Sequence, residues 1–329
     1  MAQLLLGSPA QHAEMIEEAA RSSQPGRSVI AASWRRSLLH HRLDPKTLTR
    51  PPRLEQPLIR QHRDRAEALL QASLPVMDRL AGGILDTGSS LLLADRHGLI
   101  LEQRTRAADG ELFGLAGLSV GADWSEAAEG TNAIGTCLAD GRATVIWRDQ
   151  HFFARNLPLI CIGAPVEAAD GSLAGVLNIS SSREDLSDVQ ARLMALAIQD
   201  AAVQASTALF HTAFSGARIV TLGTEPGSGP SLLAVDRDDL VIGANRAARR
   251  ALKLSAADLD DRQPLTDLMA DLLGDSADRG ADLDRALRSE VTRALHRAHG
   301  NVTRAAAALG ISRATLYRKM KTLGIARRG

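Results

Sequence analysis

The sequence feature that most constrains this fold is a pair of short helical patterns joined by a glycine within residues 300–325. Thr303 can cap a short apolar helix over residues 304–309 through its side-chain oxygen. Gly310 follows that helix and supplies the left-handed backbone that a tight turn between two helices requires. This pattern predicts a helix, a sharp turn and a second helix.

The second helix has one apolar face and one basic face. Ser312 can cap it, and Leu316, Met320 and Leu323 follow the i, i+4, i+7 spacing of a buried stripe. The polar residues fall largely outside this stripe: Arg313, Thr315, Tyr317, Arg318, Lys319 and Lys321. Such a surface suits a helix that reads a DNA groove.

The charge of the same segment supports nucleic-acid binding. Residues 285–329 hold eleven Arg or Lys against one acidic residue, Glu290, so they carry about +10 in a chain with a formal net charge of +1. Arg313, Thr315 and Arg318 are candidates for base edges, and the other candidates would hold phosphates or the helix start. The full predicted DNA-binding set is Thr303, Ser312, Arg313, Thr315, Tyr317, Arg318, Lys319 and Lys321. A basic hairpin that docks on an acidic protein is the alternative.

The segment also resembles a known motif, because it reads GN-x-T-x-AA-x-x-LGISR-x-TLYRK-x-K-x-LGI. This is similar to the factor-for-inversion-stimulation (Fis) type of helix-turn-helix at the C-terminus of bacterial enhancer-binding activators. The resemblance implies double-stranded DNA as the partner and a homodimer that reads a two-fold site. A ladder at Leu283, Leu287, Val291 and Leu295 is the expected dimer seam.

Composition limits the other possibilities. A length of 329 residues and 45% hydrophobic content predict two or three globular domains. Only 3% of the residues are aromatic, which disfavours stacking on single strands. We find no apolar run of the roughly 18 residues that span a bilayer and no signal sequence, so we expect a cytoplasmic protein without a membrane partner. Cys137 and Cys161 are expected to be reduced thiols.

The middle of the chain has the pattern of a small α/β domain. Residues 91–94 and 99–101 predict a hairpin, and three further apolar runs predict strands at 144–147, 159–162 and 173–179. A helical pattern over residues 187–214 closes the unit, and its apolar positions include Leu193, Leu196 and Val203. Such a helix can pair two protomers.

Two groups of residues carry a second resemblance. One contains Glu129-Gly130-Thr131-Asn132-Ala133-Ile134-Gly135-Thr136, and the other contains Ser33-Trp34-Arg35-Arg36-Ser37 with Leu43-Asp44-Pro45. They resemble the GAF domain and N-terminal signature of the acetoin-catabolism regulator (AcoR) family, over residues 27–182. The resemblance implies a small-molecule pocket. The candidate ligand-binding residues are Trp124, Thr131, Asn132, Cys137, His151 and Cys161. No cofactor or metal is expected, because His151 and the cysteines lack ligand spacing.

Two further segments lie between the sensor and the basic helices. After a Gly/Pro/Ser-rich stretch at 223–230, which we expect to be a linker, residues 232–248 resemble the start of a PAS domain. Residues 258–284 contain nine Asp and two Arg, which predicts a solvated acidic linker or a tail that masks the basic face. The expected fold class is therefore α+β multidomain. It comprises a helical N-terminal region at 1–83, an α/β GAF sensor at 84–215, a small PAS-like α/β segment, either working or degenerate, at 216–274, and an all-α Fis-type helix-turn-helix at 275–329.

The function expected from these parts is one-component transcriptional regulation. The regulators that this chain resembles carry an ATPase module for sigma-54 polymerase, whereas none of the four Lys here follows a Gly, so no GxxxxGK phosphate loop exists. We therefore expect a non-enzymatic, sequence-specific regulator that senses a small metabolite without ATP hydrolysis, with RNA polymerase as a further candidate partner. An architectural DNA-bending protein and a cysteine-dependent GAF-fold reductase are the alternatives.

Overall fold

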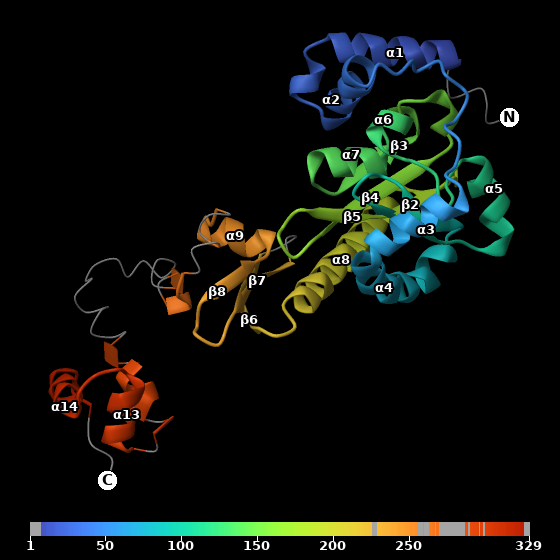
Figure 1. Ribbon diagram of the computed structural model, residues 1–329. Helices are drawn as coiled ribbons and strands as arrows, with labels where there is room; N and C mark the ends of the chain where they lie inside the picture. The colour runs from blue at the N-terminus through green and yellow to red at the C-terminus, as the bar shows by residue number, and fades with distance from the viewer. Residues whose placement is uncertain are drawn as a thin grey trace. The chain divides into compact units, whose positions relative to one another are not determined.

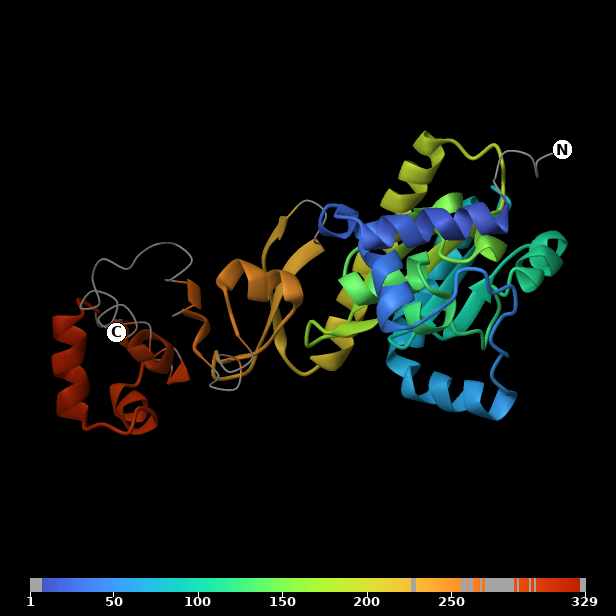
Figure 2. The same cartoon turned by 90° about the horizontal axis from the view of Figure 1, so that it is seen from above.

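The computed structural model of the chain describes residues 8–225, 229–255, 259, 263–266, 268–269, 287–288, 290–295, 297–298 and 300–325. It divides into two compact units (Figures 1 and 2), one comprising residues 1–235 and 242–255 and the other residues 236–241 and 256–329. Most of the expected acidic linker, together with Leu283, lies outside the described residues. The expected α+β class is confirmed by the helical, α/β and C-terminal helical parts.

The N-terminal part of the first unit is helical, as the sequence predicts. Ser8 and Ser28 cap its first two α-helices, each accepting a hydrogen bond from a backbone N–H in the first turn. The elements are α1 (Pro9–Arg21), η2 (Gln24–Gly26), α2 (Val29–Arg35), the π-helical turn η3 (Arg36–His40), α3 (Gln56–Arg65) and α4 (Glu67–Leu85).

A five-stranded antiparallel sheet forms the centre of this unit, in the order β2-β1-β5-β4-β3. Its strands are β1 (Ser89–Asp95), β2 (Ile100–Arg104), β3 (Thr144–Trp147), β4 (Ile160–Glu167) and β5 (Leu173–Ser181). Figure 1 shows α4 and α8 on one face of the sheet and α6 and α7 on the other. The remaining elements are η4 (Ala107–Asp109), α5 (Gly110–Leu115), α6 (Glu126–Glu129), α7 (Ala133–Asp140), η5 (Arg148–Gln150), η6 (Ala154–Asn156) and α8 (Asp188–Ala213).

Strand β1 shows how the sheet divides two cores. Successive side chains of a strand point to opposite faces. Leu91 and Leu93 therefore join the apolar cluster under α4 and α8, whereas Leu92 and Ala94 join the cluster under α5 and α7. All seven residues of β1 are buried, so this strand is covered on both faces. The near-continuous apolar run in the sequence follows from that double burial.

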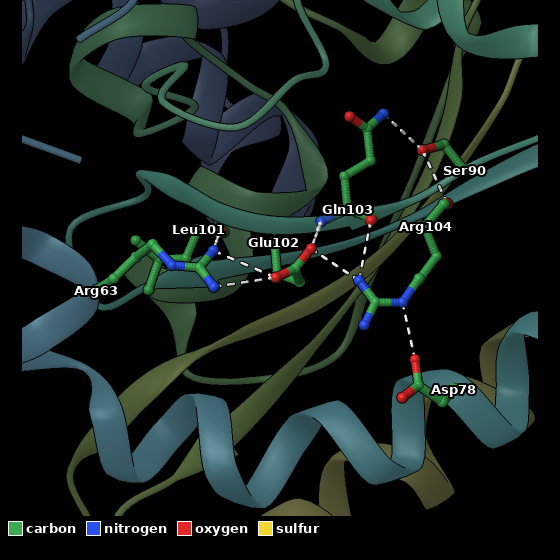
Figure 3. Close-up of polar contacts among 7 residues, drawn as sticks. All are labelled: Arg63, Asp78, Ser90, Leu101, Glu102, Gln103 and Arg104. Carbon is green, nitrogen blue, oxygen red and sulfur yellow. Dashed lines mark hydrogen bonds and ion pairs between the residues drawn. The ribbon is translucent and has the colours of Figure 1, made fainter. Parts of the chain in front are cut away.

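Charged side chains hold the edge strand β2 to the helices beside it (Figure 3). Arg104 extends from β2 to Asp78 of α4, with Nε 2.8 Å from Oδ1, and its Nη1 lies 2.7 Å from Glu102 Oε1. Arg63 of α3 donates to the same Glu102 carboxylate at 3.2 Å. Charge along an edge strand also discourages pairing with another chain.

Helix α8 is a core helix over most of its length. Ser187 caps it, and eight of its residues, from Ala191 to Phe210, are buried. It is the described helix whose length and apolar composition would suffice to cross a membrane, a test that a buried core helix also passes. Val189, Leu193 and Leu196 form an exposed apolar row on its N-terminal half.

The Gly/Pro/Ser-rich stretch expected to be a linker instead belongs to a β-hairpin. Strands β6 (Arg218–Glu225) and β7 (Gly229–Val235) pair in antiparallel register from Arg218↔Val235 to Glu225↔Gly229. Two of the glycines that suggested a flexible linker, Gly223 and Gly229, are therefore strand residues, and Gly229 has a positive φ of 71°. β8 (Val241–Ala244) completes this sheet, and Asn245 caps α9 (Arg246–Leu252) as the PAS-like pattern predicts.

The second unit contains the predicted pair of helices, α13 (Val302–Ala308) and α14 (Arg313–Thr322). Gly300, Gly310 and Gly324 have φ values of 81°, 66° and 64°, and each ends a helical segment in the left-handed conformation. Val291 is 2% exposed in the cluster that also holds Leu316 of α14, and Leu287 and Leu295 pack against it. This part of the expected dimer seam is thus used in the core of its own unit.

Candidate functional site

The start of α13 differs from the sequence expectation. Asn301, and not Thr303, is the N-cap, because its side-chain oxygen accepts a hydrogen bond from Arg304 N at 3.1 Å. Asn and Thr can both cap, and Asn301 is correctly placed because Gly300 ends the preceding helix immediately before it. Thr303 is therefore an exposed residue in the first turn of α13, free of any capping role.

Ser312 caps α14 as the sequence predicts. Its Oγ accepts a hydrogen bond from Thr315 N at 3.1 Å and lies 2.8 Å from Thr315 Oγ1. The two hydroxyl groups thus fix the first turn of the helix together. The guanidinium of Arg313 lies beside the ring of Tyr317, 5.6 Å from the ring centre.

One side of α14 is buried, which leaves the opposite side for a partner. Leu316, Met320 and Leu323 are 0%, 5% and 9% exposed, as the predicted stripe requires. Arg318 is two residues from Leu316, or about 200° round the helix, and is exposed. Lys321 is also exposed, whereas Tyr317 and Lys319 are half-buried at the sides. The exposed side is therefore basic.

In the first unit, a buried carboxylate, Glu126, holds the N-terminal helices to the α/β domain. Arg36 binds it through two hydrogen bonds of 2.8 Å, and Ser33 donates to it at 2.5 Å. The hydrogen bonds to Glu126 raise the pKa of the Arg36 guanidinium above its ordinary value. Ser33 Oγ also lies 2.8 Å from Thr131 Oγ1 and 3.1 Å from Thr136 Oγ1.

A second buried carboxylate, Glu129, lies one turn further along α6. It accepts hydrogen bonds from Arg155 at 3.0 Å, Asn156 at 3.1 Å and Arg50 at 3.4 Å. Arg50 belongs to the loop between η3 and α3, so it ties that loop to the sensor. We call these two carboxylates and the residues bound to them the carboxylate clasp.

Three of the six predicted ligand residues lie in or beside this clasp. Thr131 is bonded to Ser33, and Asn132 caps α7 by accepting from Gly135 N at 2.9 Å. His151 is fully buried against α1, where His12 Nε2 donates to its carbonyl oxygen at 2.9 Å. Burial lowers the pKa of His151 to about 4, so the imidazole is neutral at pH 7.

The other three predicted residues, Trp124, Cys137 and Cys161, share the apolar cluster between the sheet and α7. Trp124 Nε1 donates to the Gly117 carbonyl oxygen at 2.8 Å. Both thiols are free and buried, and burial raises the pKa of Cys161 to about 12 and that of Cys137 still further above its ordinary range. These cysteines are therefore protonated thiols. The six residues form two groups rather than one.

A polar patch on the same face of the sheet joins Cys161 to four residues that the sequence analysis missed. Ser90 and Ser180 are cross-strand partners, as are Ser180 and Cys161, whose Sγ lies 3.1 Å from Ser180 Oγ. Asn178 donates to Ser180 Oγ at 2.8 Å, and Gln103 donates to Ser90 Oγ at 3.1 Å. We call Ser90, Gln103, Cys161, Asn178 and Ser180 the polar patch.

The unusual member of the polar patch is Asn178. It is 1% exposed, and its Oδ1 has no hydrogen-bond partner among the described residues. A buried polar group of this kind is normally paired, so the position calls for a donor. The available signal was an Asn in an otherwise apolar strand, Leu177-Asn178-Ile179. All five patch residues are uncharged.

Comparison with known families identifies both ends of the chain. Residues 288–328 match the family described as "Bacterial regulatory protein, Fis family", so the exposed basic side of α14 belongs to a helix-turn-helix of bacterial regulatory proteins. Residues 10–205 match the family described as "MimR, N-terminal domain", which covers more than half of the chain. The chain therefore belongs to that family.

The similar proteins include regulators of acetoin metabolism. The chain is 32% identical over 234 residues to the acetoin catabolism regulatory protein of Cupriavidus necator, covering 69% of this chain and 34% of that protein. It is also 32% identical to the acetoin dehydrogenase operon transcriptional activator of Bacillus subtilis, covering 47% of this chain and 25% of that protein. The chain thus spans about a third or less of the length of these relatives. The expected resemblance to acetoin-catabolism regulators with a C-terminal helix-turn-helix is confirmed.

The fold of the first unit also has a solved counterpart. The structure of the E. coli DhaR(N)–DhaL complex contains a chain that matches with a TM-score of 0.50 and 16% identity, covering 69% of this chain and 78% of that one. At this identity the match concerns the fold alone.

We predict that Glu126→Gln loosens the N-terminal helices. The change leaves Asp140, at 3.2 Å, as the one carboxylate among the described residues that is paired with Arg36, and it should lower the free energy of unfolding by about 1 to 2 kcal/mol. Urea unfolding can be followed by tryptophan fluorescence, because Trp34, Trp124 and Trp147 all lie in this unit. Hydrogen exchange should rise first in α1 and α2. Glu184→Gln, at an exposed position, is the matched control, and equal exchange in the two variants would contradict the clasp.

We also predict a pH dependence that arises from His151. Its pKa is about 4 in the folded chain and 6.5 when exposed, so the unfolded chain binds more protons between these values. Stability is therefore lost as the pH falls through this window, by about 2 kcal/mol between pH 7 and pH 5. Urea unfolding at both pH values measures the loss. His151→Gln should show a smaller loss, and an unchanged one would refute the assignment.

Proposed function

We propose that this chain is a one-component, sequence-specific transcriptional regulator whose sensor binds a small metabolite and which acts without ATP hydrolysis. In this proposal residues 1–83 and 84–215 form the sensor with its helical N-terminal region, 216–274 contain the PAS-like segment and 275–329 bind DNA. It works in the cytoplasm and is not an enzyme. Effector and DNA would be linked by a reciprocal coupling free energy, commonly about 1 to 3 kcal/mol.

The single observation that carries this proposal is the basic exposed side of α14 in a Fis-family helix-turn-helix. We propose that Arg318, Arg313 and Thr315 contact base edges in the major groove. The remaining predicted residues would position the helix on phosphates: Thr303, Ser312, Tyr317, Lys319 and Lys321. Thr303 would act from α13, and Ser312 through the start of α14.

A homodimer accords with this use of α14. Two recognition helices about 34 Å apart read the two halves of a two-fold site. Val189, Leu193 and Leu196 of α8 present an apolar row that is 61% to 67% exposed, and we propose that it contacts the same row of a second copy. RNA polymerase is a further candidate partner, since regulators of this kind act on transcription at bound promoters.

For the effector we propose a small uncharged hydroxyketone bound at the polar patch. Asn178 Oδ1 can accept a hydroxyl hydrogen there, and the uncharged surroundings disfavour an ion. The site would be lined by Trp124, Cys137 and Cys161, because these residues belong to the adjacent apolar cluster. The other predicted residues, Thr131, Asn132 and His151, would hold that lining in place. The names of the relatives nominate acetoin.

The two rival functions each conflict with an observation. A reductase would need thiolates, but burial raises the pKa of Cys137 and Cys161 far above neutral pH. An architectural DNA-bending protein would have no use for the large sensor domain that fills more than half of this chain. ATP hydrolysis is disfavoured by the lack of a phosphate-loop sequence.

The DNA-binding assignment predicts different effects for two basic residues. Arg318→Ala should cost about 1 to 3 kcal/mol on the preferred site and relax its sequence preference. Lys321→Ala should weaken binding to all sequences and reduce the salt slope by about 1. Competition binding over several salt concentrations measures both. Arg60→Ala on α3 is the control, and an unchanged specificity profile in Arg318→Ala would refute the base contact.

The effector assignment predicts that acetoin raises the melting temperature of the full chain. Butanone, which has the ketone but lacks the hydroxyl group, should bind more weakly by about tenfold, because Asn178 would gain no donor. Asn178→Leu, which is similar in shape, should fold and lose the preference. Equal affinity for the two ketones, or acetoin binding preserved in Asn178→Leu, would contradict the polar patch as the site.

A further inference from the structure

A cavity in the first unit lies away from the polar patch. It has a volume of about 400 Å³, within the range of ligand pockets. The turn after α7, strand β4 and helix α8 form one side, and α9 with the start of β7 forms the other. The polar residues that line the cavity include Arg142, Glu167, Gln199, Thr207, Arg246 and Arg250.

The charge of this lining favours an anion. Three arginines face one glutamate, which leaves a formal charge of +2 on the cavity wall. Arg142 has 58% of its side chain exposed, with Asp140 at 3.8 Å, and Arg250 is also exposed. Exposed guanidinium groups can turn toward a ligand and bind a carboxylate or phosphate through paired hydrogen bonds.

Arg246 has a structural role in the cavity wall and is not free to bind a ligand. Its Nη1 lies 3.3 Å from the Gly141 carbonyl oxygen and 3.3 Å from Glu167 Oε1, so it fastens α9 to the sensor. Glu167 is half-buried, and its backbone N donates to Ser206 Oγ of α8 at 2.8 Å. Glu167 thus partly offsets the positive wall, and Arg142 and Arg250 remain to hold a ligand.

We infer that this cavity binds a small anionic metabolite carrying carboxylate or phosphate groups, recognised chiefly by Arg142 and Arg250. The site is separate in residues and in chemistry from the uncharged polar patch, and it does not depend on the proposed effector or on DNA binding. The walls of the cavity come from the sensor on one side and from α9 and β7 on the other. A bound anion would therefore hold the β6-β7-β8 sheet and the sensor together. The chain would then respond to two chemically different ligands.

The test is calorimetric titration of the full-length protein with succinate, citrate and inorganic phosphate at constant ionic strength. Succinamide, the uncharged analogue of succinate, is the ligand control. We expect at least one of the three anions to bind and succinamide not to bind. The basic helix-turn-helix could also attract anions, so the variants decide where binding occurs.

Arg142→Gln and Arg250→Gln should each weaken binding about tenfold, the loss expected for one charge-assisted hydrogen bond. Glu167→Gln should strengthen it, because the change removes the competing negative charge. Matched controls at exposed sites, Arg60→Gln and Glu184→Gln, make the same changes in net charge and should have no effect.

Opposite shifts for Arg250→Gln and Glu167→Gln, with silent controls, would establish the site. Binding that is equal in all five variants would place the anion elsewhere and overturn the inference. Absence of binding by all three anions in the unmodified protein would overturn it as well. Both outcomes leave the DNA-binding proposal untouched, because the titration contains no DNA.

Discussion

The sensor depends on two carboxylates placed one turn apart, Glu126 and Glu129. Each is almost fully buried, and a buried carboxylate is tolerated only when cations and hydrogen-bond donors surround it. Arg36 and Arg50, the cations that reach them from the N-terminal segment, lie about ninety and eighty residues earlier in the chain. The segment from Ser33 to Arg50 is therefore bound into the α/β domain. Removing this segment would leave Glu126 buried without Arg36 and Ser33, whereas Glu129 would keep Arg155 and Asn156.

The hydrogen bonds of the carboxylate clasp explain why this chain carries both the N-terminal signature at Ser33–Ser37 and the signature at Glu129–Thr136. The segment Ser33–Ser37 supplies donors, and the segment Glu126–Thr136 supplies the acceptors that they bind. Neither half is satisfied without the other. A small displacement of α6 or α7 would therefore be transmitted to the N-terminal helices through hydrogen bonds of 2.5 to 3.1 Å.

Local signals predicted much of the fold. Strand β3 (Thr144–Trp147) and the stripe of α14 were predictable because a period of two or of 3.6 residues follows directly from one buried face. The linker prediction was wrong for residues 223–225 and 229–230, because glycines in paired strands and glycines in a flexible linker are locally alike, and only the pairing of β6 with β7 separates them. The Thr303 cap failed for a similar reason, since Asn301 competes for the same role.

The site was harder to foresee than the fold. Thr131 and His151 both have the chemistry of ligand residues. The imidazole of His151 keeps one nitrogen, Nε2, without a partner among the described residues, whereas the hydroxyl of Thr131 is occupied by a long-range partner, Ser33. Such partners are invisible in local sequence. Conversely, Asn178 stands in a strand pattern that only suggested a core, and its unsatisfied oxygen becomes apparent only when the neighbouring strands and α7 are in place. Residue type predicts what a side chain could do, and packing decides whether it remains available.

The proposed function depends above all on sequence-specific DNA binding by α14. The most direct measurement is an in vitro selection of genomic fragments by the purified full-length protein at near-physiological salt. We expect a few strongly enriched sites that share an inverted repeat with half-sites one helical turn apart. Diffuse enrichment that follows DNA flexibility alone would contradict this proposal and would indicate an architectural protein.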